Sequence, residues 1–207
     1  MKLFLVRHGE TTGNIGNLYQ TSSTPLSTEG ENQAKKVADR FKEANIDLIY
    51  SSAHMRAEET SKLISKETGA KIELWEKLME IRRPSEVRGK RVDDPDVEKI
   101  MKEVTANFAN RDWKYSDEEN FFDLESRAVL VLDHLLTKHR DQTIICVSHG
   151  TFIKFLASKA IFRDKLTPEI FDLFRHHVWS ANTGVTKLEY TERYGWRLSY
   201  WNDITHI

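Results

Sequence analysis

The sequence has few of the features that would assign it to a special class of protein. It contains one cysteine in 207 residues, which excludes an internal disulfide framework and a cysteine-based zinc site. That residue, Cys146, lies in the apolar run 144–147 and is therefore expected to be a buried thiol. Lysine plus arginine (31) nearly equals aspartate plus glutamate (32), so the net charge indicates neither a nucleic-acid nor a membrane partner. Any anion must be recognised by a local cluster of basic side chains.

Long hydrophobic runs are also missing. No apolar stretch approaches the roughly 20 residues that are needed to span a bilayer. The apolar start, residues 3–6, is too short for the hydrophobic part of an export signal. We therefore expect a cytoplasmic protein. No repeat, low-complexity tract or linker divides the chain, which predicts a single domain over residues 1–207.

Apolar runs and stretches of helical periodicity alternate along the chain. Short apolar runs predict strands at residues 3–6, 46–50, 71–74 and 143–147. Apolar residues spaced by three and four predict helices at residues 28–44, 54–68, 121–135 and 168–174, and one that begins near Thr151. For the first of these helices, Thr28 is the expected N-cap and Glu31 completes a capping box. Two β-rich segments predict a hairpin at a sheet edge, at residues 184–190 and 196–201.

This alternation predicts an α/β layered fold with a largely parallel sheet. Residues 82–120 differ from the rest, because they are dense in charge and show no periodicity until Val97–Phe108, and they predict a lid or insertion. In parallel sheets, ligands bind just beyond the carboxyl ends of the strands. Arginine and histidine follow three of the predicted strands at that edge, in Arg7-His8-Gly9, in the segment from Ser51 to Arg56, and in His149-Gly150.

His8 and His149 differ from the other histidines because each directly follows a buried strand and precedes a glycine, where a backbone can approach a ligand closely. The remaining six are expected to be ordinary surface or structural residues: His54, His134, His139, His176, His177 and His206. An imidazole has an ordinary pKa of about 6.5, so near neutral pH it can attack phosphorus and form a phosphohistidine. The planar guanidinium of Arg7 can hold two phosphate oxygens at once. The leaving alcohol needs a proton from a carboxylic acid on the opposite side.

Several motifs resemble, in order, those of the histidine phosphatase superfamily, which includes the cofactor-dependent phosphoglycerate mutases. They are Leu3 to Thr11, Asn14, Pro25-Leu26-Ser27 with Gly30 and Gln33-Ala34, Tyr50-Ser51-Ser52 with Arg56-Ala57 and Thr60, Leu78 to Ile81, Val147 to Gly150, and Asn182 before Val185. The resemblance spans nearly the whole chain and implies a three-layer α/β/α sandwich. It implies that His8 is phosphorylated, that Arg7, Arg56 and His149 complete the phosphate pocket, and that Glu80 is the general acid and then the base. It further implies lesser substrate contacts by Asn14, Asn182 and the Thr151 amide, and neither a cofactor nor a metal.

Two departures from the family pattern concern the pocket. Thr21 stands where many members have glycine, so a backbone contact to substrate at this position is in doubt. After Glu80, the familiar Gly-x-Trp-x-Gly-like run is replaced by a basic cluster, Arg82, Arg83, Arg88, Lys90 and Arg91. A solvated surface is the simpler interpretation of this cluster. The more specific hypothesis is that Arg82 and Arg83 reach over the pocket and bind a second anionic group of the substrate.

The favoured function is therefore hydrolysis of a small phosphomonoester. A phosphoglycerate mutase is the second hypothesis, although a mutase-like segment with Tyr-Gly and Leu-Gln-Gly is missing. An inactive binding module is the third, and it predicts loss of pocket residues, all five of which are present. A metal-dependent hydrolase is less favoured because no His-x-His or His-Glu-x-x-His spacing occurs. The sequence identifies neither the substrate nor the oligomeric state.

Overall fold

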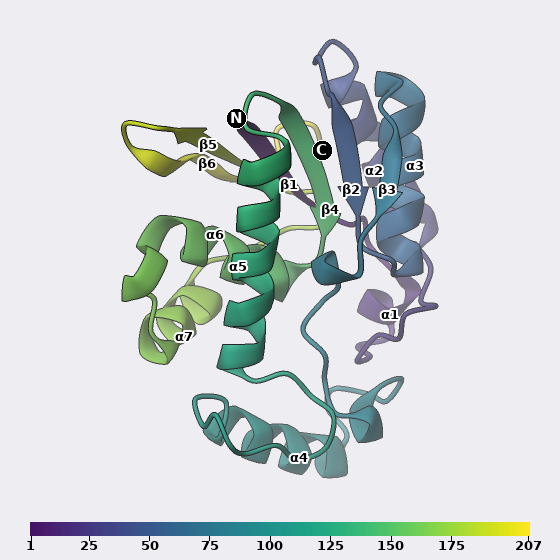
Figure 1. Ribbon diagram of the computed structural model, residues 1–207. Coiled ribbons are helices and arrows are strands. Elements are labelled where there is room, and N and C mark those ends of the chain that lie inside the picture. The colour runs from purple at the N-terminus through teal and green to yellow at the C-terminus, as the bar shows by residue number, and fades with distance from the viewer.

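The computed structural model describes all 207 residues and contains one six-stranded sheet in the order β3-β2-β4-β1-β5-β6 (Figure 1). The strands are β1 (Lys2–Arg7), β2 (Leu48–Ser51), β3 (Ile72–Leu74), β4 (Thr143–Ser148), β5 (Val185–Thr191) and β6 (Gly195–Asp203). β1, β2, β3 and β4 run parallel, whereas β5 and β6 form an antiparallel hairpin at one edge. The predicted edge hairpin is therefore confirmed.

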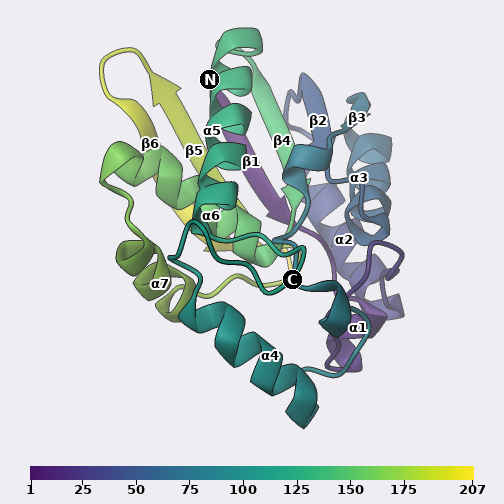
Figure 2. The same ribbon diagram turned by 60° about the horizontal axis from the view of Figure 1, so that its bottom comes forward.

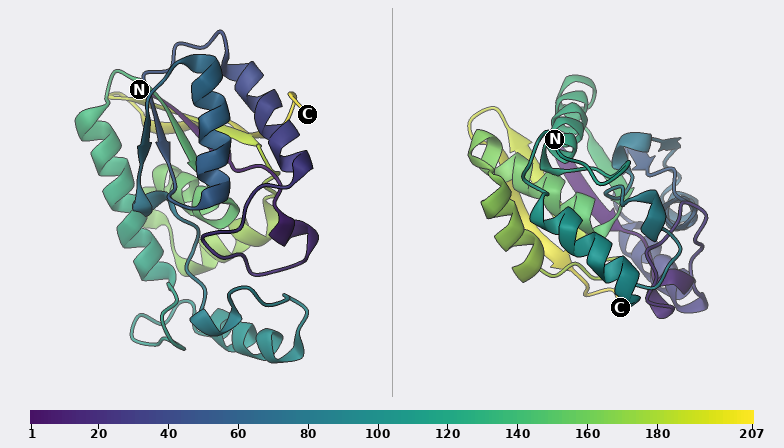
Figure 3. Two further views of the ribbon diagram at one scale, coloured as in Figure 1. Left: turned by 90° about the vertical axis from the view of Figure 1, so that its right-hand side faces the viewer. Right: turned by 90° about the horizontal axis from the view of Figure 1, so that it is seen from below.

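Helices cover both faces of this sheet, as the side view in Figure 3 shows. α2 (Thr28–Phe41) and α3 (Met55–Thr68) lie on one face, and α5 (Phe121–Lys138), α6 (Gly150–Phe162) and α7 (Pro168–His177) lie on the other. Alternate residues of β4 face opposite sides of the sheet: Ile144 and Cys146 pack in the core under α5 and α6, whereas Ile145 and Val147 pack in the core under α2 and α3. Two covered faces explain why the strand sequences are continuously apolar. The predicted α/β/α sandwich with a largely parallel sheet is confirmed.

The element boundaries agree with the sequence patterns to within a few residues, with two corrections. The N-cap of α2 is Ser27, not Thr28, because the Ser27 side chain accepts the hydrogen bond of the Gly30 amide. Residues 9–25, where the sequence predicts no regular element, contain a one-turn helix, α1 (Thr12–Ile15), which a capping box between Thr11 and Asn14 stabilises. Cys146 is buried as predicted, and burial raises the pKa of its thiol.

Residues 82–120, the expected lid or insertion, lie beyond the carboxyl ends of β1 and β4, as Figure 2 shows. The segment contains a 3-10 turn (Ser85–Val87) and α4 (Pro95–Ala106), and it has a small apolar cluster of its own that includes Val87 and Val97. Backbone hydrogen bonds join it to the loop after α1, from Tyr19 N to Lys90 O (2.9 Å) and from Val92 N to Asn17 O (2.8 Å). None of the helices in the structure has the combination of length and apolar character that crossing a membrane requires.

Candidate active site

His8 follows the last residue of β1 and is almost completely buried, with 3% of its surface exposed. Two hydrogen bonds fix the backbone of His8: the His8 N–H donates to the Ser148 carbonyl (3.0 Å), and Asn182 Nδ2 donates to the His8 carbonyl (3.0 Å). In the ring, Nδ1 lies 2.7 Å from the Gly9 carbonyl oxygen, which can only accept, so Nδ1 carries the proton. Nε2 of the neutral ring is therefore unprotonated and can accept a hydrogen bond.

The surroundings of His8 keep its ring neutral. Burial lowers the pKa of His8 well below its usual range, and the charges of Arg56 and Arg7 lower it further. Arg56 Nε–H donates to His8 Nε2 at 3.2 Å. The structure thus presents an unprotonated imidazole nitrogen to a guanidinium group, and such a nitrogen is the nucleophilic form of histidine.

Two arginines accompany His8: the half-buried Arg7 at the end of β1 and the buried Arg56 in the first turn of α3. Arg56 also donates to the Thr21 carbonyl at 2.8 Å, and Arg7 donates through Nη1 to the Ser180 carbonyl at 2.5 Å. Burial lowers the pKa of Arg56 to about 10 and lowers that of Arg7, while the nearby Glu80 opposes both shifts. Both guanidinium groups remain charged at neutral pH. Nε of Arg7 is buried and has no hydrogen-bond partner in the protein.

His149 is the N-cap of α6 and its ring centroid lies 5.0 Å from that of His8. The Ser52 hydroxyl accepts the His54 amide (3.3 Å), and the only acceptor within reach of its own proton is His149 Nε2 at 2.8 Å, so we assign Ser52 as the donor. This arrangement leaves the proton of His149 on Nδ1, which is buried and has no partner in the protein. A buried donor without a partner costs about 1–3 kcal/mol. An oxyanion bound beside His8 would offset that cost at both His149 Nδ1 and Arg7 Nε.

Glu80 lies at the N-terminus of α6. Its Oε2 accepts the Thr151 amide (3.1 Å), and its Oε1 accepts the amides of Phe152 (3.0 Å) and Ile81 (2.9 Å). A helix N-terminus offers unpaired N–H groups and a partial positive charge, and both favour a carboxylate there. Glu80 lines the same cavity as His8, Arg7 and Arg56, and its charge opposes the lowering of the pKa of both arginines.

These residues surround a cavity of about 910 Å³, near the upper end of the range for small-molecule sites. Of the residues that the sequence analysis selected, the cavity wall contains Arg7, His8, Thr21, Arg56, Glu80, Arg82, Arg83 and Thr151. His149 lies directly behind the wall, against His8. From the basic cluster, Arg88 also lines the cavity but is paired with Asp117, whereas Arg91 pairs with Asp93 elsewhere.

Four expected substrate contacts have other partners in this structure. Asn14 accepts the N–H and hydroxyl of Thr11 within the α1 capping box and does not line the cavity. Asn182 lies behind His8 and holds its carbonyl. The Thr21 amide donates to Thr24 Oγ1 (3.1 Å), and the Thr151 amide donates to Glu80. A contact from the Thr151 amide to phosphate would therefore require the Glu80 carboxylate to move.

The loop after His8 packs directly on the first turn of α2. A Cβ added at Gly30 would lie 2.8 Å from the carbonyl carbon of Glu10 and 2.9 Å from its nitrogen. The Ser27 amide donates to the Glu10 carbonyl (2.9 Å), and the Glu10 amide donates to Gln33 (2.9 Å). These contacts fix the backbone that carries the Gly9 carbonyl, and so they fix the tautomer of His8.

The cavity wall also contains residues for which the sequence predicted no role in the site, among them Tyr19, His54 and Arg127. His54 approaches His149 with ring centroids 4.9 Å apart, and its Nδ1 lies 3.2 Å from Arg56 Nη2. Burial lowers the pKa of His54 to about 4, with a smaller effect from Arg56. Only Arg127 had a signal in the sequence, because it occupies the apolar face of α5 between Leu124 and Val131, where a charged residue is unusual.

The arrangement is suited to a tetrahedral oxyanion: a neutral imidazole nitrogen, two guanidinium forks, a second imidazole and one carboxylate at the carboxyl ends of parallel strands. Nowhere do three or more His, Cys, Asp or Glu side chains come together in a way that could hold a metal ion. Fold and cavity together define an α/β protein with a basic cavity centred on a buried histidine.

Comparisons with known proteins agree with this class. The family model of the histidine phosphatase superfamily (branch 1) matches residues 3–204, and the chain therefore belongs to this superfamily. The chain is 27% identical to a probable phosphoglycerate mutase GpmB of Enterobacter sp., over 100% of this chain and 95% of that protein. It is 26% identical to phosphoglycerate mutase-like protein 4 of Arabidopsis thaliana, over 100% of this chain and 86% of that protein.

Among solved structures, the fold is similar to that of phosphoserine phosphatase from Entamoeba histolytica in complex with phosphoserine. The TM-score is 0.80 at 26% identity, and the match covers 100% of this chain and 98% of that one. The superfamily thus has relatives named as mutases and relatives named as phosphatases. Membership supports an enzyme, without deciding between the two reactions.

Proposed function

We propose that the protein is a phosphomonoester hydrolase that works through a phosphohistidine at His8. Nε2 of His8 attacks phosphorus and forms the N–P bond, while the bond from phosphorus to the leaving oxygen breaks and Glu80, in its acid form, gives that oxygen a proton. Arg7, Arg56 and His149 Nδ1–H stabilise the charge on the phosphoryl oxygens. Glu80 then takes a proton from the water that attacks phosphorus, and the N–P bond breaks with its electron pair returning to Nε2.

One observation carries this proposal: His8 Nε2 is unprotonated and buried beside two nitrogen atoms that have no hydrogen-bond partner in the fold. Nδ1 is committed to Gly9 (2.7 Å), and Arg7 Nε and His149 Nδ1 are buried without partners. A purely structural histidine would be expected to have its neighbours satisfied. This pattern also argues against an inactive binding module, because binding alone does not require a fixed tautomer.

The test is to trap the intermediate. Wild-type protein mixed with p-nitrophenyl phosphate and quenched in base should carry an acid-labile, base-stable phosphoryl group, and His8→Ala should carry none. Glu80→Gln should accumulate more of it, because a good leaving group needs no acid whereas the attacking water still needs a base. His176→Gln, at an exposed histidine of α7, is the matched control and should behave as wild type. Phosphatase activity that survives in His8→Ala would overturn the mechanism.

Specificity is proposed to come from the basic cluster. Arg83 is half-buried in the cavity wall, and Arg82 is exposed in that wall; neither guanidinium makes a hydrogen bond to the protein. Both are therefore free to bind a second anionic group of the substrate. The double variant Arg82→Ala, Arg83→Ala should lose activity on substrates with a second phosphate or carboxylate and keep it on p-nitrophenyl phosphate. Unchanged relative rates would remove this part of the proposal.

Phosphoglycerate mutase activity is the second candidate, because the curated relatives named above carry that name. A mutase must protect the phosphohistidine from water long enough to return the phosphoryl group to a sugar-acid phosphate. Incubation with 3-phosphoglycerate separates the two candidates: a hydrolase releases inorganic phosphate, and a mutase forms the 2-isomer. We further propose a cytoplasmic location, since a single buried cysteine suits a reducing compartment, and cell fractionation tests it.

A further inference from the structure

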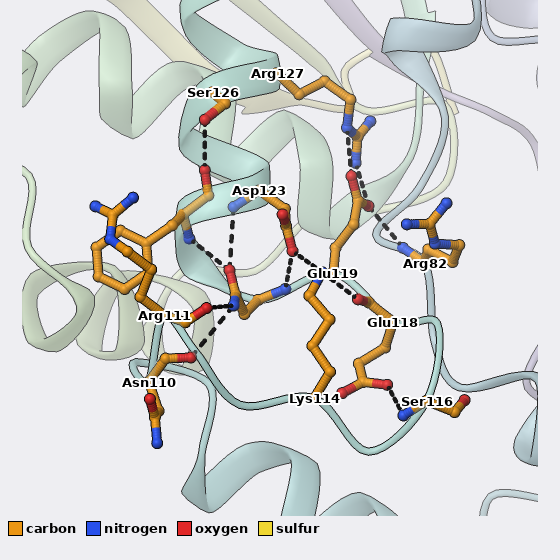
Figure 4. A network of polar contacts seen from close by, with 12 residues as sticks. Arg82, Asn110, Arg111, Lys114, Ser116, Glu118, Glu119, Asp123, Ser126 and Arg127 are labelled. Carbon is orange, nitrogen blue, oxygen red and sulfur yellow. Dashed lines mark hydrogen bonds and ion pairs between the residues drawn. The ribbon is translucent and has the colours of Figure 1, made fainter.

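A buried ion pair lies beside the cavity, between Arg127 of α5 and Glu119 in the loop before it, as Figure 4 shows. Arg127 binds Glu119 with two parallel hydrogen bonds, from Nε to Oε1 (2.9 Å) and from Nη2 to Oε2 (2.7 Å). The side chains are only 10% and 12% exposed. Arginine provides five donors in a rigid plane, so this bidentate pairing fixes the orientation of its remaining donors.

The pair holds the chain on both sides of Glu80. Nη1 of Arg127 donates to the carbonyls of Met79 (2.5 Å) and Lys77 (3.1 Å), which precede Glu80. Glu119 holds Arg82, which follows it: Glu119 Oε2 accepts the Arg82 amide (2.9 Å), and the Glu119 amide donates to the Arg82 carbonyl (3.0 Å). Glu80 and Ile81 therefore lie between two anchored peptide units.

The same arginine also supports the opposite partner of Glu80. Its guanidinium carbon lies 4.0 Å from the ring centroid of Phe152, and the Phe152 amide is one of the three N–H groups that hold the Glu80 carboxylate. Phe152 is completely buried in the core. Arg127 thus contacts both the backbone that precedes Glu80 and the residue whose amide donates to the Glu80 carboxylate.

We propose that Arg127 and Glu119 are positioning residues that hold Glu80 in place for proton transfer. The inference rests on the function proposed above for Glu80. A buried ion pair adds little to stability by itself, because desolvation offsets the attraction of the charges. Its contacts to three flanking peptide units give it a different role, since general acid catalysis requires the carboxyl group within hydrogen-bond reach of the leaving oxygen.

The kinetic test separates positioning from binding and from general damage. Arg127→Gln should lower kcat/KM for glycerol 2-phosphate, a poor leaving group, by about 10- to 100-fold. It should lower kcat/KM for p-nitrophenyl phosphate much less, since that leaving group needs no acid. Inhibition by inorganic phosphate should be unchanged. Equal losses on both substrates, or weaker inhibition by phosphate, would overturn the proposal and make Arg127 a structural or substrate-binding residue.

A second measurement needs no activity. Amide hydrogen exchange at Thr151 and Phe152 should be faster in Arg127→Gln and in Glu119→Gln, approaching the rates in Glu80→Ala, in which the acceptor is absent. The control is Arg40→Gln, which breaks an ion pair of the same N–O distance, 2.7 Å, between α2 and β6 and should leave these amides unchanged. Unchanged exchange in Arg127→Gln would overturn the inference. If exchange changes but the wild type forms no phosphohistidine, the positioning stands and the proposed function fails.

Discussion

Replacing Gly30 with alanine is a strong test of how the fold supports His8. Gly30 lies in the first turn of α2, where alanine would be favoured over glycine by roughly 0.5–1 kcal/mol on helix propensity alone. Propensity therefore predicts a more stable protein. The structure predicts the opposite, because the new methyl group would meet the backbone of Glu10.

The size of the effect follows from the geometry. The added Cβ would overlap the Glu10 carbonyl oxygen, its nearest neighbour, and would lie 2.8 Å from the carbonyl carbon. Two carbon atoms prefer about 3.5–4.0 Å, so the loop must move by at least about 0.7–1.2 Å. Overpacking of this kind costs about 1–3 kcal/mol. The displaced loop carries the Gly9 carbonyl that holds His8 Nδ1, and a misplacement of about 1 Å in an active site lowers the rate by about 100-fold.

The assay compares wild type, Gly30→Ala and Glu29→Ala by thermal unfolding and by hydrolysis of p-nitrophenyl phosphate. Glu29 is the exposed neighbour in the same helical turn, so its replacement controls for the change of residue type. We expect Gly30→Ala to lower Tm by about 2–12 °C, at about 2–4 °C per kcal/mol, and to lower kcat/KM by about 100-fold. A Gly30→Ala protein that is more stable than wild type and fully active would refute the reasoning.

Two further predictions concern the buried histidines. Burial lowers the pKa of His54 and of His206 to about 4, and it lowers the pKa of His8 and of His149 well below the usual range. Below about pH 6.5 the unfolded chain therefore takes up protons that the folded chain excludes. Stability should therefore be complete above pH 6.5 and decline toward pH 4, and a Tm that is constant between pH 7.5 and 5 would contradict this. Ser52→Ala removes the partner of His149 Nε2 and should cost about 1–3 kcal/mol and lower kcat/KM. Ser158→Ala, which removes a buried hydroxyl bonded to its own helix, should keep full activity, and equal activity losses in both variants would contradict the role of Ser52.

Much of the candidate site is visible in the sequence because it depends on strand ends. A strand that is buried on both faces can be predicted from its continuous apolar run, and parallel strands bring their carboxyl ends to one edge of the sheet. The residues that directly follow such runs, Arg7, His8 and His149, can therefore be selected without a structure. Arg56, in the first turn of the next helix, is by itself an ordinary helix residue, and the family pattern gave it its role. Glu80 lies in a loop without periodicity, and only its place in the family pattern identified it.

Other features depend on contacts between residues far apart in the chain. The N-cap of α2 is Ser27 instead of Thr28 because the Glu10 backbone binds that serine. Asn182 is an ordinary polar residue in the sequence, and a tertiary contact decides that it holds the His8 carbonyl. The Arg127–Glu119 pair has only a weak signal, one charged residue on an apolar helix face.

The sequence by itself determined the alternation of strands and helices, the layered fold and the basic residues at the strand ends, because local periodicity and short-range turns encode these features. Only the tertiary structure decided which nitrogen of His8 is free, which donors lack partners and what holds Glu80. These properties depend on burial and on hydrogen bonds such as that of Arg56 with His8, 48 residues apart. The electrostatics of a buried site depend on all the groups that pack around it, and a local sequence pattern does not predict which groups these are.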